Sequence, residues 1–267
     1  MNAKDILFKD YIAIDANDRM TTLIGKLKVH GAHHAVVFDG KKYIGMTNKR
    51  RWVRTRINSS EVKVRSVLVK VPTLSKETSL SEIARLMYTA DTPVLPVLEK
   101  GRVIGTVCAH DVIASAQDAL RKYRLDEVST ERLTTVNWDD TIARVVNIIK
   151  NKGYDHLPVL ENGKLVGIVT AVDLLETYLC FPPDRQGSTG RRGAAASPTK
   201  EAHTAHITID NEMSRLVQTI TPGARLDAVA DLMDKHHLSS LVVVDEKNKP
   251  VGIVTVKNLL KVIAKNA

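Results

Sequence analysis

Apolar residues recur in the same order four times along the chain, each time as two short runs separated by a turn. The first run of each pair reads AVVF from Ala35, LPVL from Leu95, LPVL from Leu157 and LVVV from Leu241. Turn-forming residues follow these runs, namely Asp39-Gly40, Lys100-Gly101, Asn162-Gly163 and Lys247-Asn248. Two apolar runs joined by such a turn predict a β-hairpin. The chain is therefore expected to contain four hairpins.

Helical patterns flank each hairpin. Upstream of the third and fourth hairpins, apolar residues follow the i, i+3, i+4, i+7 spacing of an amphipathic helix. They are Ile142, Val145, Val146 and Ile149 in one case, and Leu226, Val229, Ala230 and Met233 in the other. A second short helix is predicted after each hairpin, such as VDLLETYL from Val172, and a short strand opens each copy, such as LTTV from Leu133. The repeating unit is therefore β-α-β-β-α.

One glycine in the second run of each hairpin marks the period of the repeat. These glycines are Gly45, Gly105, Gly167 and Gly252, spaced by about sixty residues except for a longer last interval. We interpret the glycines as hairpin punctuation. The predicted repeats span residues 1–62, 63–122, 123–180 and 207–267, with residues 181–206 as a linker.

The predicted linker lacks apolar periodicity and is rich in Gly, Ala, Ser, Pro and Arg. Such a composition is typical of a long, mobile spacer. The alternative is an arm that binds a partner or nucleic acid through Arg185, Arg191 and Arg192.

The hairpins with LPVL, followed by GIVTAVDLL and GIVTVKNLL, resemble the CBS domain, the small module named after cystathionine β-synthase. The resemblance covers nearly the whole chain except about residues 181–206. It implies an α/β (α+β) fold of four CBS repeats, paired through their sheets into two Bateman modules that form a flat, pseudo-symmetric disc. The γ subunit of AMP-activated protein kinase and stand-alone archaeal and bacterial CBS proteins have this four-repeat organisation.

Physical arguments independently favour pairing of the repeats. A single copy is near the size at which a hydrophobic core is only marginally stable. Its strands, such as VLPVL, are apolar on both faces and need cover on both sides. A second copy would supply that cover.

Three positions in each repeat carry candidate binding chemistry. A Thr hydroxyl can hydrogen-bond a phosphate or a base edge, and an Asp one turn into a helix can accept from ribose hydroxyls. Nucleotide-binding CBS repeats carry this combination, so the resemblance implies the same roles here. The positions are the opening strand (Ala13, Thr73, Thr135, Thr219), three residues past the glycine (Asn48, Cys108, Thr170, Thr255) and six past it (Arg51, Asp111, Asp173, Asn258).

The four copies match this pattern to different degrees. Copy three has all three groups, and copy four differs by having Asn258 in place of Asp. Copy two keeps Thr73 and Asp111, but Cys108 is a poor phosphate donor. The alternative is that these side chains only cap helices, because Ser, Thr, Asp and Asn are preferred at helix starts.

Copy one departs from the pattern at all three positions. Arg51 lies in the run Lys49-Arg50-Arg51 and can bind phosphate but cannot accept from ribose. We expect Arg51 or a neighbour to serve a phosphate that is bound mainly by another copy. The alternative is a solvated basic helix face.

The composition narrows the function classes. The net charge of +9 favours anionic partners, while only 4% aromatic residues argues against a single-strand nucleic-acid binder. The sequence contains no catalytic set, nucleotide-phosphate loop or metal-binding spacing of histidines. Two cysteines and the absence of a signal peptide or long apolar run predict a cytoplasmic protein without a membrane anchor.

These observations predict a non-catalytic regulatory sensor of AMP, ADP, ATP or an adenosyl compound. It would have no catalytic cofactor and would act on a protein partner or through homo-oligomerisation. The alternatives are a basic scaffold or nucleic-acid-binding protein with empty clefts, and an enzyme with an unrecognised site.

Overall fold

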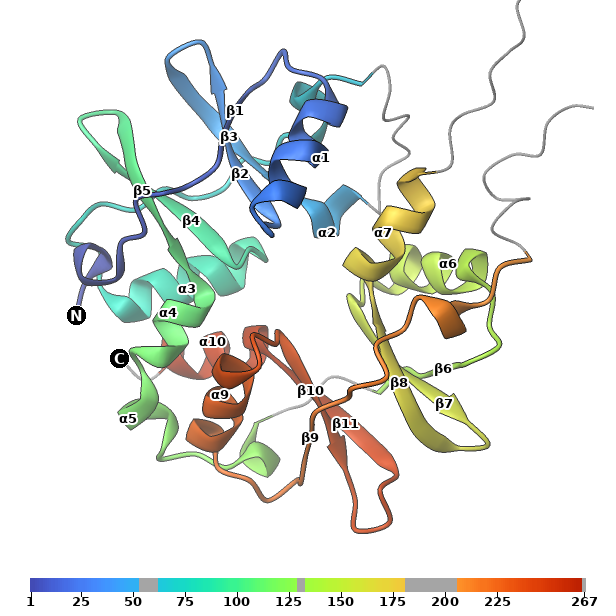
Figure 1. Ribbon diagram of the computed structural model, residues 1–267. Coiled ribbons are helices and arrows are strands. Elements are labelled where there is room, and N and C mark those ends of the chain that lie inside the picture. The colour runs from blue at the N-terminus through green and yellow to red at the C-terminus, as the bar shows by residue number, and fades with distance from the viewer. Residues whose placement is uncertain (53–61, 129–132, 181–205, 266–267) are drawn as a thin grey trace, which may run out of the picture. The chain divides into compact units, whose positions relative to one another are not determined.

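The computed structural model describes residues 1–52, 62–128, 133–180 and 206–265, and Figure 1 shows the order of their elements. The chain divides into two compact units. Unit 1 contains residues 1–48, 63–133 and 218–267, and unit 2 contains residues 49–62 and 134–217. The predicted linker lies outside the described residues except for His206. The predicted repeat boundaries and the predicted disc stay predictions.

Each repeat has the predicted mixture of strands and helices (Figure 1). Repeat 1 contains β1 (Ala13–Asp15), α1 (Met20–Val29), β2 (His34–Asp39), β3 (Lys42–Asn48) and α2 (Lys49–Trp52). Repeat 2 contains α3 (Leu80–Ala90), β4 (Val94–Glu99), β5 (Arg102–Cys108), α4 (Ala109–Ala114) and α5 (Gln117–Leu120). Its opening strand is reduced to one parallel bridge between Leu74 and Val97.

The third and fourth repeats follow the same order. Repeat 3 contains β6 (Val136–Asn137), α6 (Ile142–Lys152), β7 (His156–Glu161), β8 (Lys164–Thr170) and α7 (Ala171–Cys180). Repeat 4 contains β9 (Thr219–Ile220), α9 (Leu226–Lys235), β10 (Ser240–Val244), β11 (Pro250–Thr255) and α10 (Val256–Lys265). The predicted α/β fold is confirmed.

The four predicted hairpins are the antiparallel pairs β2–β3, β4–β5, β7–β8 and β10–β11. In β4–β5 the loop residues Lys100 and Gly101 both have positive φ, of 49° and 76°. Asn162 and Gly163 repeat this in β7–β8, with 50° and 76°. Two-residue loops of this type match the twist of the strands that they join, which fixes the register of each hairpin.

The amphipathic helices bury the residues that their spacing predicts. Each of the four apolar residues predicted to face the core from α6 is at most 3% exposed, and the four from α9 are at most 1% exposed. Thr141 caps the start of α6, since its Oγ1 accepts a hydrogen bond from the backbone N–H of Arg144 at 3.3 Å. The side-chain pattern therefore determines which helix face packs inward.

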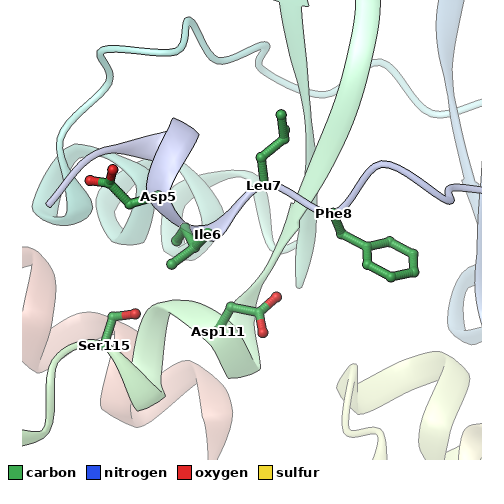
Figure 2. A pocket seen from close by; sticks show the side chains of 6 residues that line it. All are labelled: Asp5, Ile6, Leu7, Phe8, Asp111 and Ser115. Atoms are coloured by element: carbon green, nitrogen blue, oxygen red, sulfur yellow. The ribbon is translucent and has the colours of Figure 1, made fainter.

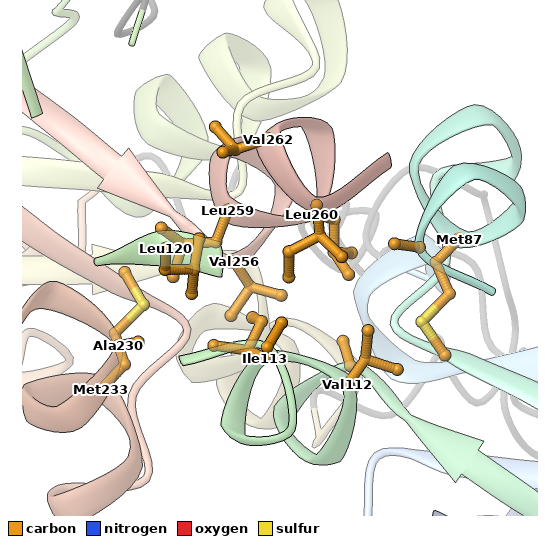
Figure 3. Close-up of a cluster of buried hydrophobic side chains, with 14 of the residues drawn as sticks. Met87, Val112, Ile113, Leu120, Ala230, Met233, Val256, Leu259, Leu260 and Val262 are labelled. Atoms are coloured by element: carbon orange, nitrogen blue, oxygen red, sulfur yellow. The ribbon is translucent and has the colours of Figure 1, made fainter. Parts of the chain in front are cut away.

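Unit 1 is built around the helices of repeats 2 and 4. Figure 3 shows their buried side chains meeting in one cluster. Helix α10 packs against α3 and α4, while α9 packs against α4 and α5. Leu259 of α10 and Val112 of α4 are both fully buried, and truncating such a residue to Ala costs about 2–5 kcal/mol. The two repeats thus share one hydrophobic core.

The sheets of repeats 1 and 2 also pack on each other, as their two-faced apolar strands predict. Strand β3 contacts β5, and Val36, Met46 and Val94 form a small buried cluster between the sheets. The ring of Tyr43 is edge-on to Phe38 at this contact, and burial raises the pKa of the Tyr43 hydroxyl to about 12. This contact confirms the predicted pairing through the sheets for repeats 1 and 2.

A segment with a 3₁₀ turn precedes the opening strand of each repeat and packs on a different repeat. The turns are η1 (Ala3–Ile6), η2 (Val64–Val67), η3 (Leu125–Glu127) and η4 (Ile209–Asn211). Four pairs of residues bridge these exchanged segments to the repeats, namely Phe8 with Thr106, Val69 with Met46, Arg124 with Arg225 and Ser214 with Ile168. The first segment of repeat 1 thus lies on repeat 2, and the first segment of repeat 2 lies on repeat 1. The segment around Arg124 likewise contacts repeat 4 at Arg225, and the segment around Ser214 contacts repeat 3 at Ile168.

In the first three repeats, the glycine that marks the period makes room for an exchanged segment. A Cβ at Gly105 would lie 2.7 Å from the Phe8 backbone oxygen, and one at Gly45 would lie 2.7 Å from that of Val69. At Gly167 the nearest atom would be the Met213 sulfur, at 2.6 Å. Our interpretation of these glycines as hairpin punctuation is therefore wrong, because they lie within strands and permit close approach of a neighbouring segment.

Candidate functional site

The strand register makes the three predicted positions spatially equivalent in the four repeats. In every repeat, the glycine that marks the period (the marker glycine) pairs with a Val in the first strand of the hairpin. The same Val also pairs with a residue at the opening-strand position. The triplets are Ile14, Val37 and Gly45; Leu74, Val97 and Gly105; Val136, Val159 and Gly167; and Ile220, Val243 and Gly252. The residue before each triplet's first member is therefore Ala13, Thr73, Thr135 or Thr219.

Copy three places its candidate groups at one end of its sheet. Thr170 is the last residue of β8 and pairs with His156 of β7, so their side chains share a face of the sheet. Thr135 lies directly before β6, and the register puts it on that same face. Asp173 is the third residue of α7, which begins where β8 ends. The structure thus brings Thr135, Thr170 and the first turn of α7 together.

Thr170 and Asp173 form a reciprocal helix cap. The backbone N–H of Thr170 donates to Asp173 Oδ2 at 2.8 Å, and the backbone N–H of Asp173 donates to Thr170 Oγ1 at 3.2 Å. The helix-cap interpretation is therefore correct for this pair. Capping holds the carboxylate in a fixed place at the sheet end, and a role in ligand binding for these residues stays a prediction.

Copy four has a related but more closed arrangement. Asn258 is buried, and its Oδ1 accepts from both the backbone N–H and the hydroxyl of Thr255, each at 2.8 Å. Thr219 lies in β9 and pairs with Val242 of β10. Because the Thr255 hydroxyl donates to Asn258, this pair also acts as a local cap, and its predicted ligand contacts stay predictions.

Copy two has an actual pocket beside its candidate acid. Asp111 lies in α4, and Figure 2 shows it across from the exchanged N-terminal segment. The pocket has a volume of about 310 Å³ and is lined by Asp5, Ile6, Leu7, Phe8, Asp111 and Ser115. Burial raises the pKa of the Cys108 thiol, which keeps it neutral. Of the three candidate residues of copy two, Asp111 lines this pocket, whereas Thr73 and Cys108 do not.

Copy one contributes its basic run to copy three. Helix α2 packs against α7 inside unit 2, and Arg50 Nη1 lies 2.9 Å from Asp155 Oδ2. The two side chains are only 21% and 11% exposed. The backbone oxygen of Asp155 accepts from the N–H of Ala171, directly after Thr170. Arg51 lies in the same short helix, but Arg50 is the residue that makes this ion pair with copy three.

The charge of Arg50 also reaches His156. Burial and the nearby Arg50 guanidinium lower the pKa of His156 to about 4, so this imidazole is neutral at pH 7. His156 shares the sheet face of Thr170, which places the positive charge of Arg50 close to the candidate groups of copy three. Sequence reasoning identified the basic run but not the partner Asp155, because nothing in the local pattern predicts a contact between repeats 1 and 3.

No group of three or more His, Cys, Asp or Glu side chains in the described part is arranged to hold a metal ion. No helix in that part combines the length and hydrophobicity that a membrane crossing requires.

Comparison with family models supplies the identification. The model of the CBS domain matches residues 64–118, 125–179 and 207–265, which together make up more than half of the chain. The chain belongs to the CBS domain family. Each matched CBS region begins at or just before the exchanged segment that opens a repeat. Repeat 1 precedes these matches, but it has the same strand triplet as the other three repeats.

Known proteins resemble the chain over nearly its whole length. The uncharacterized protein MJ1404 of Methanocaldococcus jannaschii is 23% identical over 98% of this chain, which spans 61% of that relative. The crystal structure of MJ1225 from the same organism, described as a candidate archaeal homologue of γ-AMPK, matches with a TM-score of 0.80. It is 19% identical and the match covers 98% of this chain and 99% of that one.

A second solved structure has the same fold. An uncharacterized conserved protein from Pyrococcus horikoshii matches with a TM-score of 0.66 and 19% identity, covering 98% of this chain and 100% of the other. At such identities the matches show the CBS fold alone.

Proposed function

We propose that this CBS protein is a non-catalytic sensor of adenine nucleotides. It binds AMP, ADP, ATP or an adenosyl compound at its repeats, and the bound state is read by a protein partner or a second copy of the chain. Copy three is the principal site. The description of MJ1225 as a candidate γ-AMPK homologue agrees with this proposal.

The observation that carries the proposal is the packing of the basic helix α2 against α7. It places Arg50 beside the start of β7, next to the sheet end where Thr135, Thr170 and Asp173 converge. Hydroxyls suit a phosphate or a base edge, a carboxylate suits ribose hydroxyls, and a guanidinium suits phosphate. One ligand that carries all three features is a nucleotide.

The arrangement also offers a way to transmit binding. Arg50 and Asp155 are held together by an ion pair in which both side chains are largely withdrawn from water. A phosphate at this end of the sheet would compete with Asp155 for the guanidinium, since both are anions that bind Arg. Ligand binding would thereby change how α2 packs on α7, and a partner in the cytoplasm would detect that change.

The test is calorimetric titration of the full chain with adenosine, AMP, ADP and ATP. Asp173→Ala should weaken nucleotide binding about ten- to hundredfold, because a hydrogen bond to a charged acceptor contributes about 1.5–3 kcal/mol. Asp173→Asn should have a smaller effect, since Asn258 occupies the same position in copy four. Saturating nucleotide should raise the melting temperature of the wild-type chain by mass action.

A matched control separates capping from binding, because Asp173→Ala also removes a helix cap. Thr141→Ala removes the cap of α6 and should cost a similar ~1 kcal/mol of unfolding free energy. It should leave nucleotide affinity unchanged. If no adenine compound binds at millimolar concentration, or if Asp173→Ala binds as tightly as wild type, the sensor proposal is wrong.

A further inference from the structure

The pocket of copy two differs in charge from the site of copy three. Among the described residues, those that line this pocket supply two carboxylates, Asp5 and Asp111, and no cationic side chain. Partial loss of hydration raises the pKa of Asp111, while the Cys108 backbone N–H donates to its carboxylate and opposes that rise. A phosphate placed in this pocket would meet like charges without a compensating Arg or Lys from its walls.

Phe8 gives the pocket an aromatic wall. Its side chain is 54% exposed although its backbone is fixed by two hydrogen bonds with Thr106, both of 2.9 Å. Leu7 turns to the other side of the segment, toward Gly105, and Figure 2 shows Phe8 on the side of Asp111. A rigid backbone with an exposed ring is a ready stacking surface, since every nucleobase has an aromatic face.

The size of the pocket suits a nucleoside. Its volume of about 310 Å³ lies at the lower end of the range for small-molecule sites. The apolar residue Ile6 lines it together with Phe8, and the Asp111 carboxylate can accept from hydroxyls. The pocket thus combines a flat apolar surface with an acceptor and with negative charge.

We propose that the copy-two pocket binds an uncharged nucleoside, with its base stacked on Phe8 and its ribose hydroxyls donating to Asp111, and that it rejects nucleoside phosphates. Phe8 and Asp5 reach this site from the first segment of repeat 1. The protein would then distinguish a nucleoside from its phosphates by using two repeats of opposite local charge. The choice of adenosine as the ligand rests on the proposed function, whereas the preference for an uncharged ligand rests on the pocket itself.

The experiment titrates adenosine and AMP into the full chain carrying Asp173→Ala, which weakens the copy-three site. Adenosine should bind at least about tenfold more tightly than AMP in this background. Adding Phe8→Leu, which keeps an apolar side chain but removes the ring, should weaken adenosine binding about five- to hundredfold. Phe8→Tyr should restore binding to within about threefold of the Asp173→Ala chain, which would also show that the segment remains in place.

Charge is tested separately with Asp5→Asn. Asp5 Oδ2 accepts from the backbone N–H of Asn2 at 2.7 Å, and an Asn side-chain oxygen can do the same. Removing this charge should reduce the difference between the affinities for adenosine and AMP about two- to fivefold. Leu216→Ala serves as the control, because Leu216 is 86% exposed and lies in unit 2, and it should change neither affinity.

The outcomes are distinct for the two proposals. Equal affinities for adenosine and AMP, no adenosine binding, or unchanged adenosine affinity in Phe8→Leu would each overturn the proposal for copy two. The proposed function of copy three is decided by a different readout, namely whether Asp173→Ala binds AMP more weakly than the wild-type chain.

Discussion

The candidate groups of copies two and three occupy equivalent positions in the same strand framework but have opposite electrostatic surroundings. The candidate groups of copy three lie in unit 2 beside the Arg50–Asp155 pair, and burial together with the Arg50 guanidinium lowers the pKa of His156. Copy two lies in unit 1, and its pocket has Asp5 and Asp111 in its walls. The repeat therefore fixes where the candidate groups lie, while side chains from other repeats or exchanged segments set the charge around them.

The two regions also differ in how tightly the exchanged segment presses on the marker glycine, and this predicts the largest effect. Gly105→Ala should lower the free energy of unfolding by about 2–3 kcal/mol, because its Cβ would meet the Phe8 backbone oxygen at 2.7 Å. Gly167→Ala should cost only about 1 kcal/mol, because its nearest neighbour is the flexible Met213 side chain. Urea denaturation measures both values.

Gly25→Ala is the control for that pair of substitutions. No atom lies within 4 Å of a Cβ at Gly25, which is in helix α1, so the substitution should stabilise the protein by about 0.5–1 kcal/mol. If Gly105→Ala and Gly167→Ala have equally small effects, the segments lie more loosely on both repeats than the distances indicate.

The neutral His156 makes the stability of copy three dependent on pH. Its folded pKa of about 4 lies below the unfolded value of 6.5, so the unfolded state binds protons first as the pH falls. Stability should therefore be fully present above pH 6.5 and should be lost progressively between pH 6.5 and pH 4. The wild-type chain should lose up to about 2 kcal/mol more than His156→Gln between pH 7 and pH 5. Chemical denaturation at several pH values tests this, and parallel losses in both chains would contradict it.

Replacing Arg50 and Arg121 in turn compares the stability contributed by the largely buried ion pair of copy three with that of an exposed ion pair in unit 1. Arg50→Gln should cost about 1–2 kcal/mol of stability, since it removes the guanidinium from an ion pair with the poorly exposed Asp155. Arg121→Gln should cost at most about 0.5 kcal/mol, because Arg121 is 61% exposed in its 3.3 Å contact with Asp227. In titrations, Arg50→Gln should weaken the binding of ATP more than the binding of adenosine. Equal stability losses, or equal losses for the two ligands, would show that Arg50 has no special role.

Salt should have the smallest effect and should act on one copy only. Raising the ionic strength from about 0.05 M to about 0.5 M should weaken AMP binding at copy three about two- to fivefold by screening the basic run. Adenosine binding at copy two should change little, because an uncharged ligand has no charge to screen. Titration of the wild-type chain with AMP and of Asp173→Ala with adenosine measures the two responses, and identical salt dependence would contradict the assigned charges.

Periodicity was sufficient to predict the repeats, because each helix and hairpin buries a local pattern of side chains. Residues such as Val145 and Val229 are buried as their spacing requires. The positions of Thr170 and Asp173 at a strand end and helix start were likewise predictable from their distance to Gly167. Local spacing could even predict the helix cap that they form.

Contacts between distant repeats could not be predicted in the same way. Phe8 lies against a strand about one hundred residues later in the chain, and Arg50 pairs with Asp155 at a similar separation. Neither contact leaves a periodic signal, since each depends on which repeats pack together. The structural role of Gly105 was missed for the same reason, because its neighbour comes from the beginning of the chain.

The exchanged segments also constrain how the protein is made. During synthesis, the segment around Phe8 leaves the ribosome long before its acceptor strand β5 exists, so its apolar side chains must wait for repeat 2. In repeat 3 the acceptor strand is made first and its partner later. Ser214 pairs with Ile168 at the edge of β8 only after the region between residues 181 and 205 has been translated. Contacts of such high sequence separation slow folding, since loop closure must precede the gain in contact energy. The nascent chain therefore acquires its final connections late, and a stop or cleavage before Ser214 would leave repeat 3 with an open sheet edge.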